Sequence, residues 1–346
     1  MNEIPADVCG IQVGEETAMK RIFYVCACTK EKGGIYGCSI EEKNEKGAEV
    51  RVLSYFPVEQ PMYMAIDGDT LYAVLREPEP TQSGVVRFRI NEDYTLTKIS
   101  EVELTHGAVA AHICVHKGKV YCPNYLGGST ILLPDRMAVH LGRGVDPDRQ
   151  TTSHPHQALI TPDEKYLVVN DLGTDEIRIF DLDLTKQLSS ARTPDGSGAR
   201  HGVFSEDGRY YYCVGEMGGD VSVYSYHEGK MIYKSTVSVL PEDLHGYNKS
   251  AAVRLHDGKL YVSNRGHDSV CVLKADGENL SRIGFIPAEG RSPREASFVG
   301  DFLLCGNEET NDVTVFALRP DGLSDGCICR LPLPNPIGIN EYKMCP

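Results

Sequence analysis

The strongest constraint on the fold is a repeat that occurs in seven copies, spaced 42 to 50 residues apart. Each copy contains a turn with Asp or Gly, an apolar run, a polar loop and a second run in which apolar and polar residues alternate. The stretch from Thr161 to Phe180 shows this order clearly. Such alternation indicates half-buried β-strands. The apolar runs that mark the seven copies begin at Phe23, Leu71, Val120, Tyr166, Tyr210, Leu260 and Phe302.

A period of about 40–50 residues made of four short strands is typical of one blade of a β-propeller. Seven such periods occupy nearly all of the 346 residues. Two stacked β-sandwiches would not explain one regular period. We therefore predict an all-β fold, a seven-bladed β-propeller with four-stranded antiparallel blades. It forms a single domain over residues 21–330, with terminal extensions at 1–20 and 331–346.

The charge balance limits the classes of partner. The 49 acidic side chains against 35 basic ones give a formal charge of −14, which disfavours binding to nucleic acid. No stretch approaches the roughly 20 consecutive apolar residues of a membrane helix. A targeting signal would have a basic region followed by an apolar one, but residues 1–17 carry acidic side chains. We expect a cytoplasmic protein that binds neither nucleic acid nor membrane. Because a closed propeller has no long free edge strand, we expect a monomer or a weak homodimer.

Twelve cysteines are scattered along the chain without a C-x-x-C pair. The pairs Cys26/Cys28 and Cys327/Cys329 each place two thiols on one face of a strand. Neither is accompanied by a second ligand pair at the spacing of a zinc site. Most of the other cysteines lie in apolar runs, and a free thiol packs like a small apolar side chain. We therefore expect reduced cysteines in the core.

The repeat also predicts where a functional site lies. In a propeller the innermost strand of each blade lines the central channel, and the loops that enter it share a face with the loops that leave the second strand. Equivalent entry positions in four copies hold His112, His156, Arg200 and Arg294. The exits from the second strand add Asn124, Asn170, Asp171, Glu216, Asn264, Arg265, Asn307 and Glu308. Arginines, histidines and a carboxylate are thus expected to converge on one channel mouth.

This constellation suits a small anionic substrate with an electrophilic carbonyl. Guanidinium groups bind carboxylate or phosphate in a bidentate manner and can stabilise an oxyanion, while a histidine or glutamate can take a proton from water. Structural interpretations also exist: His156 can be a channel-lining histidine bonded to a neighbouring strand. Arg200 and Arg265 can tie blades together by pairing with Glu216. We expect Glu216 to be paired with an arginine, functional, or both, because an unpaired carboxylate in the channel would be costly.

The segment Ser153-His154-Pro155-His156 contains an H-x-H pair on an extended stretch, a geometry that can hold a metal ion. No aspartate-rich or further histidine set occupies an equivalent position, so we favour a site without metal. The next histidine, His201, follows Arg200 directly. On a regular strand the side chain of His201 would point away from that of Arg200, and we expect it to pack against neighbouring side chains.

Several short segments resemble the lactonase family of seven-bladed propellers, which includes the propeller type of 6-phosphogluconolactonase and fungal carboxy-muconate lactonizing enzymes. The likeness runs from about residue 21 to residue 318. In one segment, Ala199 stands where the family's G-x-G-P-R-H pattern has proline. The segments are His154-Pro155-His156, Gly196 to His201, Leu240 to Asp243, Ser263 to Ser269 and Ser292-Pro293-Arg294.

The resemblance implies hydrolysis of 6-phosphogluconolactone to 6-phosphogluconate, the second step of the oxidative pentose phosphate route. Arginines would bind the phosphate and polarise the lactone carbonyl, and His156, or Glu216 through it, would activate the water. No metal or organic cofactor is required, because opening an ester ring needs a base, a water and an oxyanion partner. The implied catalytic set is His156, Arg200, Glu216 and Arg265. Substrate contacts are expected at His112, His154, Asn264 and Arg294.

Other functions stay open at the level of the sequence. A cycloisomerase that closes a lactone on a muconate-like dicarboxylate would use the same arginines and a proton donor. A metal-dependent sugar lactonase would need a carboxylate-rich channel, which this sequence lacks. A propeller that only binds proteins, as WD repeats do, is disfavoured because the repeats carry no Trp-Asp dipeptide and the chain has no Trp.

Overall fold

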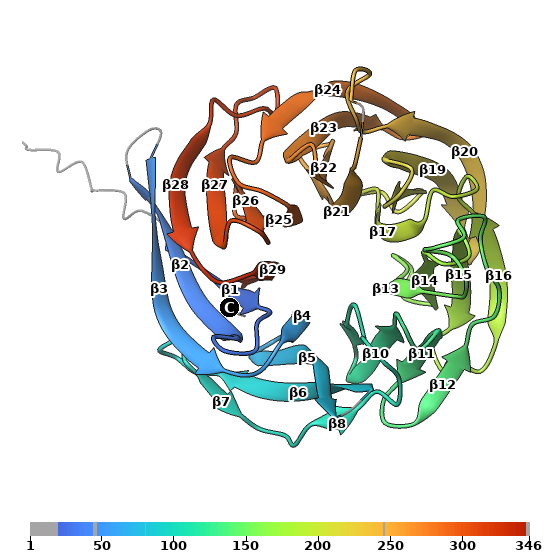
Figure 1. The fold of residues 1–346 in the computed structure, drawn as a ribbon, viewed down its shortest axis with the longest axis horizontal. Coiled ribbons are helices and arrows are strands. Elements are labelled where there is room, and N and C mark those ends of the chain that lie inside the picture. Colours follow the sequence, from blue (N-terminus) through green and yellow to red (C-terminus); the bar gives the residue numbers. More distant parts are fainter. Residues whose placement is uncertain (1–19, 44–46, 80, 245, 344–346) are drawn as a thin grey trace, which may run out of the picture.

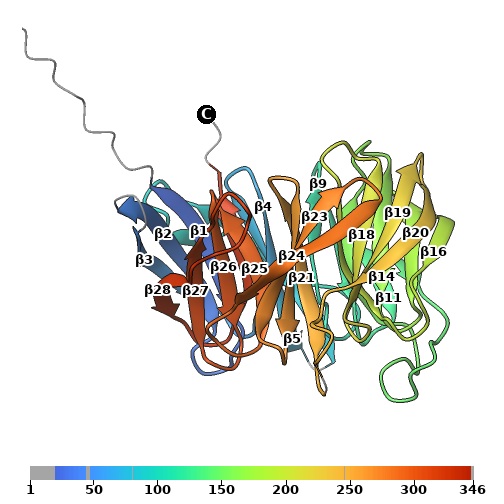
Figure 2. The ribbon, with the colours of Figure 1, turned by 90° about the horizontal axis from the view of Figure 1, so that it is seen from above.

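A computed structural model describes residues 20–43, 47–79, 81–244 and 246–343 of the chain. These residues form seven antiparallel sheets arranged in a closed ring, seen face-on in Figure 1 and edge-on in Figure 2. The prediction of an all-β seven-bladed propeller with four-stranded blades is confirmed, with one short extra strand in the second blade. Within the described ranges there is no helix long and apolar enough to cross a membrane.

The blades follow one another around the ring in chain order, each with one strand next to the ring axis (Figure 1). From the axis outward, the first blade contains β29 (Pro336–Tyr342), β1 (Arg21–Ala27), β2 (Gly34–Lys43) and β3 (Gly47–Pro57). The second contains β4 (Pro61–Asp67), β5 (Thr70–Glu79), β6 (Gln82–Ile90) and β7 (Leu96–Lys98), with β8 (Glu103–Leu104) paired to β6. The third contains β9 (Cys114–His116), β10 (Lys119–Asn124), β11 (Ser129–Leu132) and β12 (Arg136–Val139).

The remaining four blades have the same order. The fourth contains β13 (Pro155–Ile160), β14 (Tyr166–Asp171), β15 (Glu176–Asp181) and β16 (Gln187–Arg192). The fifth contains β17 (Ala199–Phe204), β18 (Tyr210–Gly215), β19 (Asp220–His227) and β20 (Lys230–Ser238). The sixth contains β21 (Lys249–His256), β22 (Lys259–Arg265), β23 (Ser269–Asp276) and β24 (Asn279–Pro287). The seventh contains β25 (Pro293–Val299), β26 (Phe302–Asn307), β27 (Asp312–Ala317) and β28 (Cys327–Pro332).

The seven apolar runs that defined the repeat are the second strands of the seven blades. These strands are buried on both faces: in β14, for example, Leu167, Val168 and Val169 are all buried. Both faces are apolar because each blade packs between two neighbours. Val168 packs in one cluster with Tyr211 and Tyr224 of the fifth blade. The core therefore consists of layers between blades, one of which closes the ring.

The ring closes through a strand from the far end of the sequence. β29 pairs antiparallel with β1, so the latest and the earliest described strands share a sheet (Figure 1). The expected domain end at residue 330 is therefore wrong, since β29 is the innermost strand of the first blade. Residues 1–19 of the expected amino-terminal extension lie outside the described residues.

The cysteines within the described ranges are free thiols. Seven of these ten are buried, and burial raises the pKa of the thiol of Cys28 to about 11 and that of Cys271 to about 12. Raised pKa values keep these thiols protonated and unreactive at neutral pH. They therefore act as small apolar side chains, as the sequence predicts. Cys9 and Cys345 lie outside the described residues.

Candidate active site

The pairing of the innermost strands is interrupted at the entry positions that the sequence repeat predicted for the site. In β13 the extra residue of a β-bulge is His156, between the pairs Pro155↔Asp171 and Gln157↔Asn170. In β25 the corresponding extra residue is Arg294. In β17 two adjacent residues, Arg200 and His201, oppose a single residue of β18. Because a bulge interrupts the alternation of a strand and re-aims side chains, these residues can face the ring axis.

The re-aimed side chains line a small, partly enclosed cavity at the axis. It leaves about 10 Å³ for the centre of a water molecule, which is roughly the room that one bound water needs. Strands β4, β13, β17, β25 and β29 and the segment before β9 contribute to its wall. The lining residues are Met62, Tyr63, Ala111, His156, Arg200, His201, Arg294, Glu295 and Ile337.

Glu216 is the centre of an arginine cluster at the end of β18. Its Oε2 accepts hydrogen bonds from Nε of Arg200 at 2.9 Å and from Nη2 of Arg265 at 3.0 Å. Its Oε1 accepts one from Nη2 of Arg149 at 2.7 Å. Burial alone would raise the pKa of this carboxyl, but the adjacent Arg265 and Arg200 hold it well below its usual range. Glu216 is therefore ionised and paired, as the sequence predicts.

The two inner arginines are fixed by further bonds to the backbone. Nη1 of Arg200 donates to the carbonyl of Ala251 at 2.7 Å, and Nε of Arg265 donates to the carbonyl of Lys249 at 3.2 Å. Burial, followed by repulsion from Arg265 and Arg294, lowers the pKa of Arg200 to about 9. Arg200 thus stays protonated at neutral pH, in a position where added negative charge is favourable.

His156 lines the cavity together with Arg200 of the arginine cluster. It is buried, and its Nδ1 has no hydrogen-bond partner among the described residues. Its ring makes edge contacts with Tyr125 at 5.6 Å and with His201 at 5.1 Å between centroids. Burial, and then the charge of Arg200, holds the pKa of His156 well below its usual range. The imidazole is therefore neutral at neutral pH and can accept a proton.

Of the residues expected to contact substrate, Arg294 lines the cavity, whereas His154 and His112 pack against tyrosine rings. Arg294 lines the cavity, 3.9 Å from the carboxylate of Glu308. His154 stacks on Tyr125 at 4.7 Å, and its Nδ1 lies 2.9 Å from the Tyr125 carbonyl. The ring of His112 packs against Tyr63 with centroids 4.4 Å apart and planes tilted by 30°, and burial lowers the pKa of His112 to about 3.

Asn264 takes a structural position instead of an expected substrate contact. It is fully buried, its Nδ2 donates to the carbonyl of Val239 at 2.9 Å, and its Oδ1 accepts from Ser250 at 2.6 Å. Asn124 makes a comparable bond from its Nδ2 to the carbonyl of Thr105 at 3.0 Å. The repeated asparagine at the end of the second strand therefore fastens the loops between blades.

The prediction that His201 packs away from the site is wrong. Instead of packing away from the site, it lines the cavity next to His156, with both ring nitrogens buried and without partners among the described residues. The expectation assumed regular alternation after Arg200, and the bulge in β17 removes that alternation.

Further polar residues of the site were not predicted. Arg149 lies in the loop before β13, which has no repeat equivalent, and it also donates to the hydroxyl of Tyr125 at 3.2 Å. Glu295 lines the cavity and pairs with Arg254 of β21 at 2.5 Å. The sequence offered one signal for the Glu295–Arg254 pair, namely that both charged residues lie on innermost strands.

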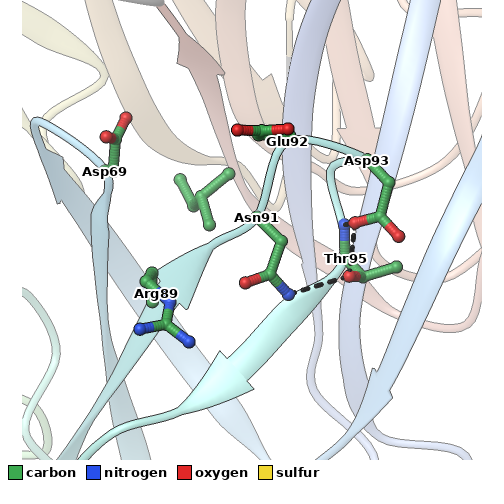
Figure 3. Close-up of a pocket in the computed structure, with 7 residues that line it drawn as sticks. Asp69, Arg89, Asn91, Glu92, Asp93 and Thr95 are labelled. Carbon is green, nitrogen blue, oxygen red and sulfur yellow. Dashed lines mark hydrogen bonds between the residues drawn. The ribbon is translucent and has the colours of Figure 1, made fainter.

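The H-x-H pair does not form a shared ligand set. His154 turns to Tyr125 and His156 to the cavity, and no group of three or more His, Cys, Asp or Glu in the described ranges could hold a metal ion. A larger hollow of about 640 Å³ lies on the second blade, lined by residues such as Asp69 and Asn91 (Figure 3). Its loop is bonded to itself, with Asn91 and Asp93 both bound to Thr95. The reactive groups converge at the axis instead.

The electrostatics of the axial site favour an anion. The guanidinium groups of Arg149, Arg200 and Arg265 surround Glu216, and that of Arg294 lies near Glu308. With the Arg254–Glu295 pair in the cavity wall, five positive charges face three negative ones in a partly desolvated mouth, although the whole chain carries −14. A phosphate or carboxylate would complete the charge balance. A neutral imidazole beside this cluster can act as a base toward water.

Comparisons with known proteins agree with the propeller fold. The sequence profile of the family described as "Lactonase, 7-bladed beta-propeller" matches residues 22–326. An uncharacterized protein of Staphylococcus epidermidis is 33% identical over 317 residues, covering 85% of this chain and 91% of that protein. A solved Bacteroides fragilis structure, provisionally assigned as a 6-phosphogluconolactonase, is 28% identical with a TM-score of 0.85, covering 95% of this chain and 99% of that one. The periplasmic gluconolactonase of Pseudomonas aeruginosa is 25% identical with a TM-score of 0.85, covering 94% and 100%.

Proposed function

Because the chain belongs to the family of seven-bladed β-propeller lactonases, we propose that it hydrolyses 6-phosphogluconolactone to 6-phosphogluconate, the second step of the oxidative pentose phosphate route. The observation that carries the proposal is the arginine cluster around Glu216, beside a neutral, buried His156. This arrangement supplies both an anion-binding surface and a base. The provisional assignment of the Bacteroides fragilis structure points to the same substrate.

In this proposal two of the arginines bind the phosphate and the other two polarise the lactone carbonyl. Arg149 and Arg294 are the more exposed members, with side chains 30% and 23% exposed, and they meet the phosphate. Arg200 and Arg265 are nearly buried and lie closest to the reacting carbonyl. Donors fixed in a desolvated place stabilise a developing oxyanion without having to reorganise.

His156 is the base, and Glu216 holds the arginines. Both oxygens of Glu216 accept hydrogen bonds from guanidinium groups, so this carboxylate has little capacity to take a proton. His156 removes a proton from water as the water oxygen bonds to the lactone carbonyl carbon. The tetrahedral intermediate then collapses, the ring C–O bond breaks, and the leaving alkoxide receives the proton.

The test is the rate at which 6-phosphogluconate forms from freshly generated lactone, above the spontaneous rate, with and without EDTA. We expect a metal-independent acceleration that falls at least about 100-fold in His156→Gln. Gluconolactone, which lacks the phosphate, is the comparison substrate, because the Pseudomonas aeruginosa neighbour is called a gluconolactonase. Preference for gluconolactone would reject the phosphate assignment. No acceleration by folded protein would reject the hydrolase assignment, and muconate-type substrates would be assayed next.

A further inference from the structure

A second buried carboxylate lies in the wall of the axial cavity. Glu295 follows Arg294 on β25 and is 1% exposed. Its Oε1 accepts a hydrogen bond from Nη2 of Arg254 at 2.5 Å, and the same nitrogen lies 3.1 Å from the hydroxyl of Tyr63. Among the described residues, Glu295 therefore has one arginine partner, whereas Glu216 has three.

The two carboxylates differ in their readiness to accept a proton. Three guanidinium groups hold the pKa of Glu216 well below its usual range. For Glu295 burial outweighs the charges of Arg254 and Arg200, and its pKa is raised. A carboxylate with a raised pKa is the better proton acceptor. Of these two, Glu295 is the one suited to take a proton during a reaction.

Glu295 shares its cavity with the base. His156 and His201 line the same wall, and Nδ1 of His156 and both nitrogens of His201 are buried without partners among the described residues. The cavity has room for about one water, and a buried water needs two to four polar partners. The two imidazoles and the Glu295 carboxylate supply that number.

We propose that Glu295 receives, through a water bound in this cavity, the proton that His156 releases from Nδ1 when its Nε2 takes a proton from the hydrolytic water. The inference rests on the proposed lactonase function. One O–H bond of the hydrolytic water breaks and its proton bonds to Nε2. The Nδ1 proton passes to the cavity water, which gives one of its own protons to Glu295. When the ring C–O bond breaks, the same path returns the proton to the leaving oxygen.

The relay answers an electrostatic problem of the site. An imidazolium at His156 would be buried near Arg200, Arg294 and Arg265. Burial and these three charges lower its pKa, and the charge of Glu216 only partly opposes them. Transfer to Glu295 removes that charge from the imidazole as it forms. His201 positions the water, and Glu295 is a positioning residue that acts through His156. Among the described residues, the titratable and charged groups that face Glu295 are Arg254 of β21, Tyr63 of β4, Arg200 and His201 of β17, Arg294 of β25, His156 of β13, Cys26 of β1 and Cys305 of β26.

The experiment compares kcat and KM for 6-phosphogluconolactone between about pH 5.5 and 8 in wild type, Glu295→Gln, Glu295→Asp and Arg254→Gln. Glu295→Gln can keep the bond to Arg254 but cannot take the proton, so kcat should fall at least about 10-fold at every pH, with KM within about twofold. Glu295→Asp keeps a carboxylate and should recover much of kcat. Arg254→Gln removes a charge that lowers the pKa of Glu295. Its activity should be lost at low pH and recover as the pH rises.

If the Glu295–Arg254 pair has only a structural role, the variants should change kcat and its pH dependence differently. Equal, pH-independent losses in Glu295→Gln and Arg254→Gln would overturn the proposal, as would a wild-type kcat in Glu295→Gln. If Glu295→Gln does not fold, an unshifted acid limb in Arg254→Gln overturns it. Glu103→Gln, which breaks the 2.7 Å ion pair with Arg87 on the second blade, is the control for loss of an ion pair. Absence of wild-type hydrolysis would reject the proposed function itself, whereas an active wild type with an unaffected Glu295→Gln rejects only the relay.

Discussion

Nη2 of Arg149 lies 2.7 Å from Oε1 of Glu216, although 67 positions separate the two residues. The first belongs to the loop before β13, and the second follows β18. The contact thus ties a loop of the fourth blade to the end of a strand in the fifth. Because the other two arginine partners of Glu216 are almost fully buried, Arg149 is the member of the cluster that reaches solvent.

Arg149→Gln should weaken substrate binding more than it slows the chemical step. The side chain is 30% exposed and its ion pair is partly solvated, so we expect a stability loss of about 1 kcal/mol or less. Loss of one charged contact to the phosphate should raise KM about 10-fold, with kcat changed less than about threefold. Steady-state kinetics and thermal unfolding measure both. The control is Arg192→Gln, which removes an arginine that is 54% exposed on β16. A fall in kcat at constant KM would show that Arg149 acts in the transition state instead.

Glu216→Gln should be strongly destabilising. The substitution leaves Arg200 and Arg265 buried without their counter-ion, and breaking a buried pair in this way costs about 3–5 kcal/mol. Urea unfolding at neutral pH gives the free energy directly. Glu308→Gln is the matched control, because Glu308 is 32% exposed and lies 3.9 Å from Arg294. We expect a change within about 0.5 kcal/mol there. Equal stability of the two variants would contradict the central role of Glu216.

Stability should fall as the pH drops below the usual histidine range. Burial lowers the pKa of His112 to about 3 and of His140 to about 4, and it holds those of His156 and His201 well below 6.5. Below pH 6.5 the unfolded chain therefore binds protons that the folded protein excludes. Each such histidine removes about 1.4 kcal/mol of stability per pH unit.

Two carboxyl groups act in the opposite direction. Burial raises the pKa of Asp220 to about 6 and also raises that of Glu295, so the folded protein binds these protons first. Because four histidines outnumber these carboxyls, a net loss of stability remains as the pH falls from about 6 to 5. Urea midpoints at several pH values measure it, and His140→Gln should reduce the slope by about 1.4 kcal/mol per unit. A flat profile over this range would refute the assignment of neutral buried histidines.

The parts of the fold that the sequence predicts are those with a local signal. Each second strand is buried on both faces, so a run such as Leu167 to Val169 identifies it without knowledge of its partners. Regular spacing of these runs then gives the number of blades. The same spacing brings Arg200 and Arg265 each into contact with Glu216, and it brings His156 into one cavity with Arg200.

The parts that the sequence does not predict depend on irregular or distant structure. His201 faces the axis because of a bulge in β17, and no composition rule marks that bulge. Arg149 lies in a loop without a repeat equivalent. Asn264 is polar at the right position, but its two bonds to Val239 and Ser250 appear only once the loops are in place. The pairing of β29 with β1 joins opposite ends of the chain, so no local pattern reveals it.

Closure by β29 should carry a large share of the stability. Ile337 packs in a cluster with Val74 and Val120 of the second and third blades, and Ile339 packs with Val299 and Leu304 of the seventh. Both are nearly fully buried, so Ile337→Ala and Ile339→Ala should each cost about 2–5 kcal/mol. The strand thus contributes to two core layers, and loss of either layer should open the ring at the first blade.

Asn340→Ala, on the same strand, is the matched control for closure of the ring. The Oδ1 of Asn340 is buried without a hydrogen-bond partner among the described residues, so its removal should be neutral or slightly stabilising. Urea unfolding compares the three variants, and hydrogen exchange of the β1 amides reports on opening of the first blade alone. If Ile339→Ala loses less than about 1 kcal/mol, then β29 frays without consequence and the propeller is held closed by its other interfaces.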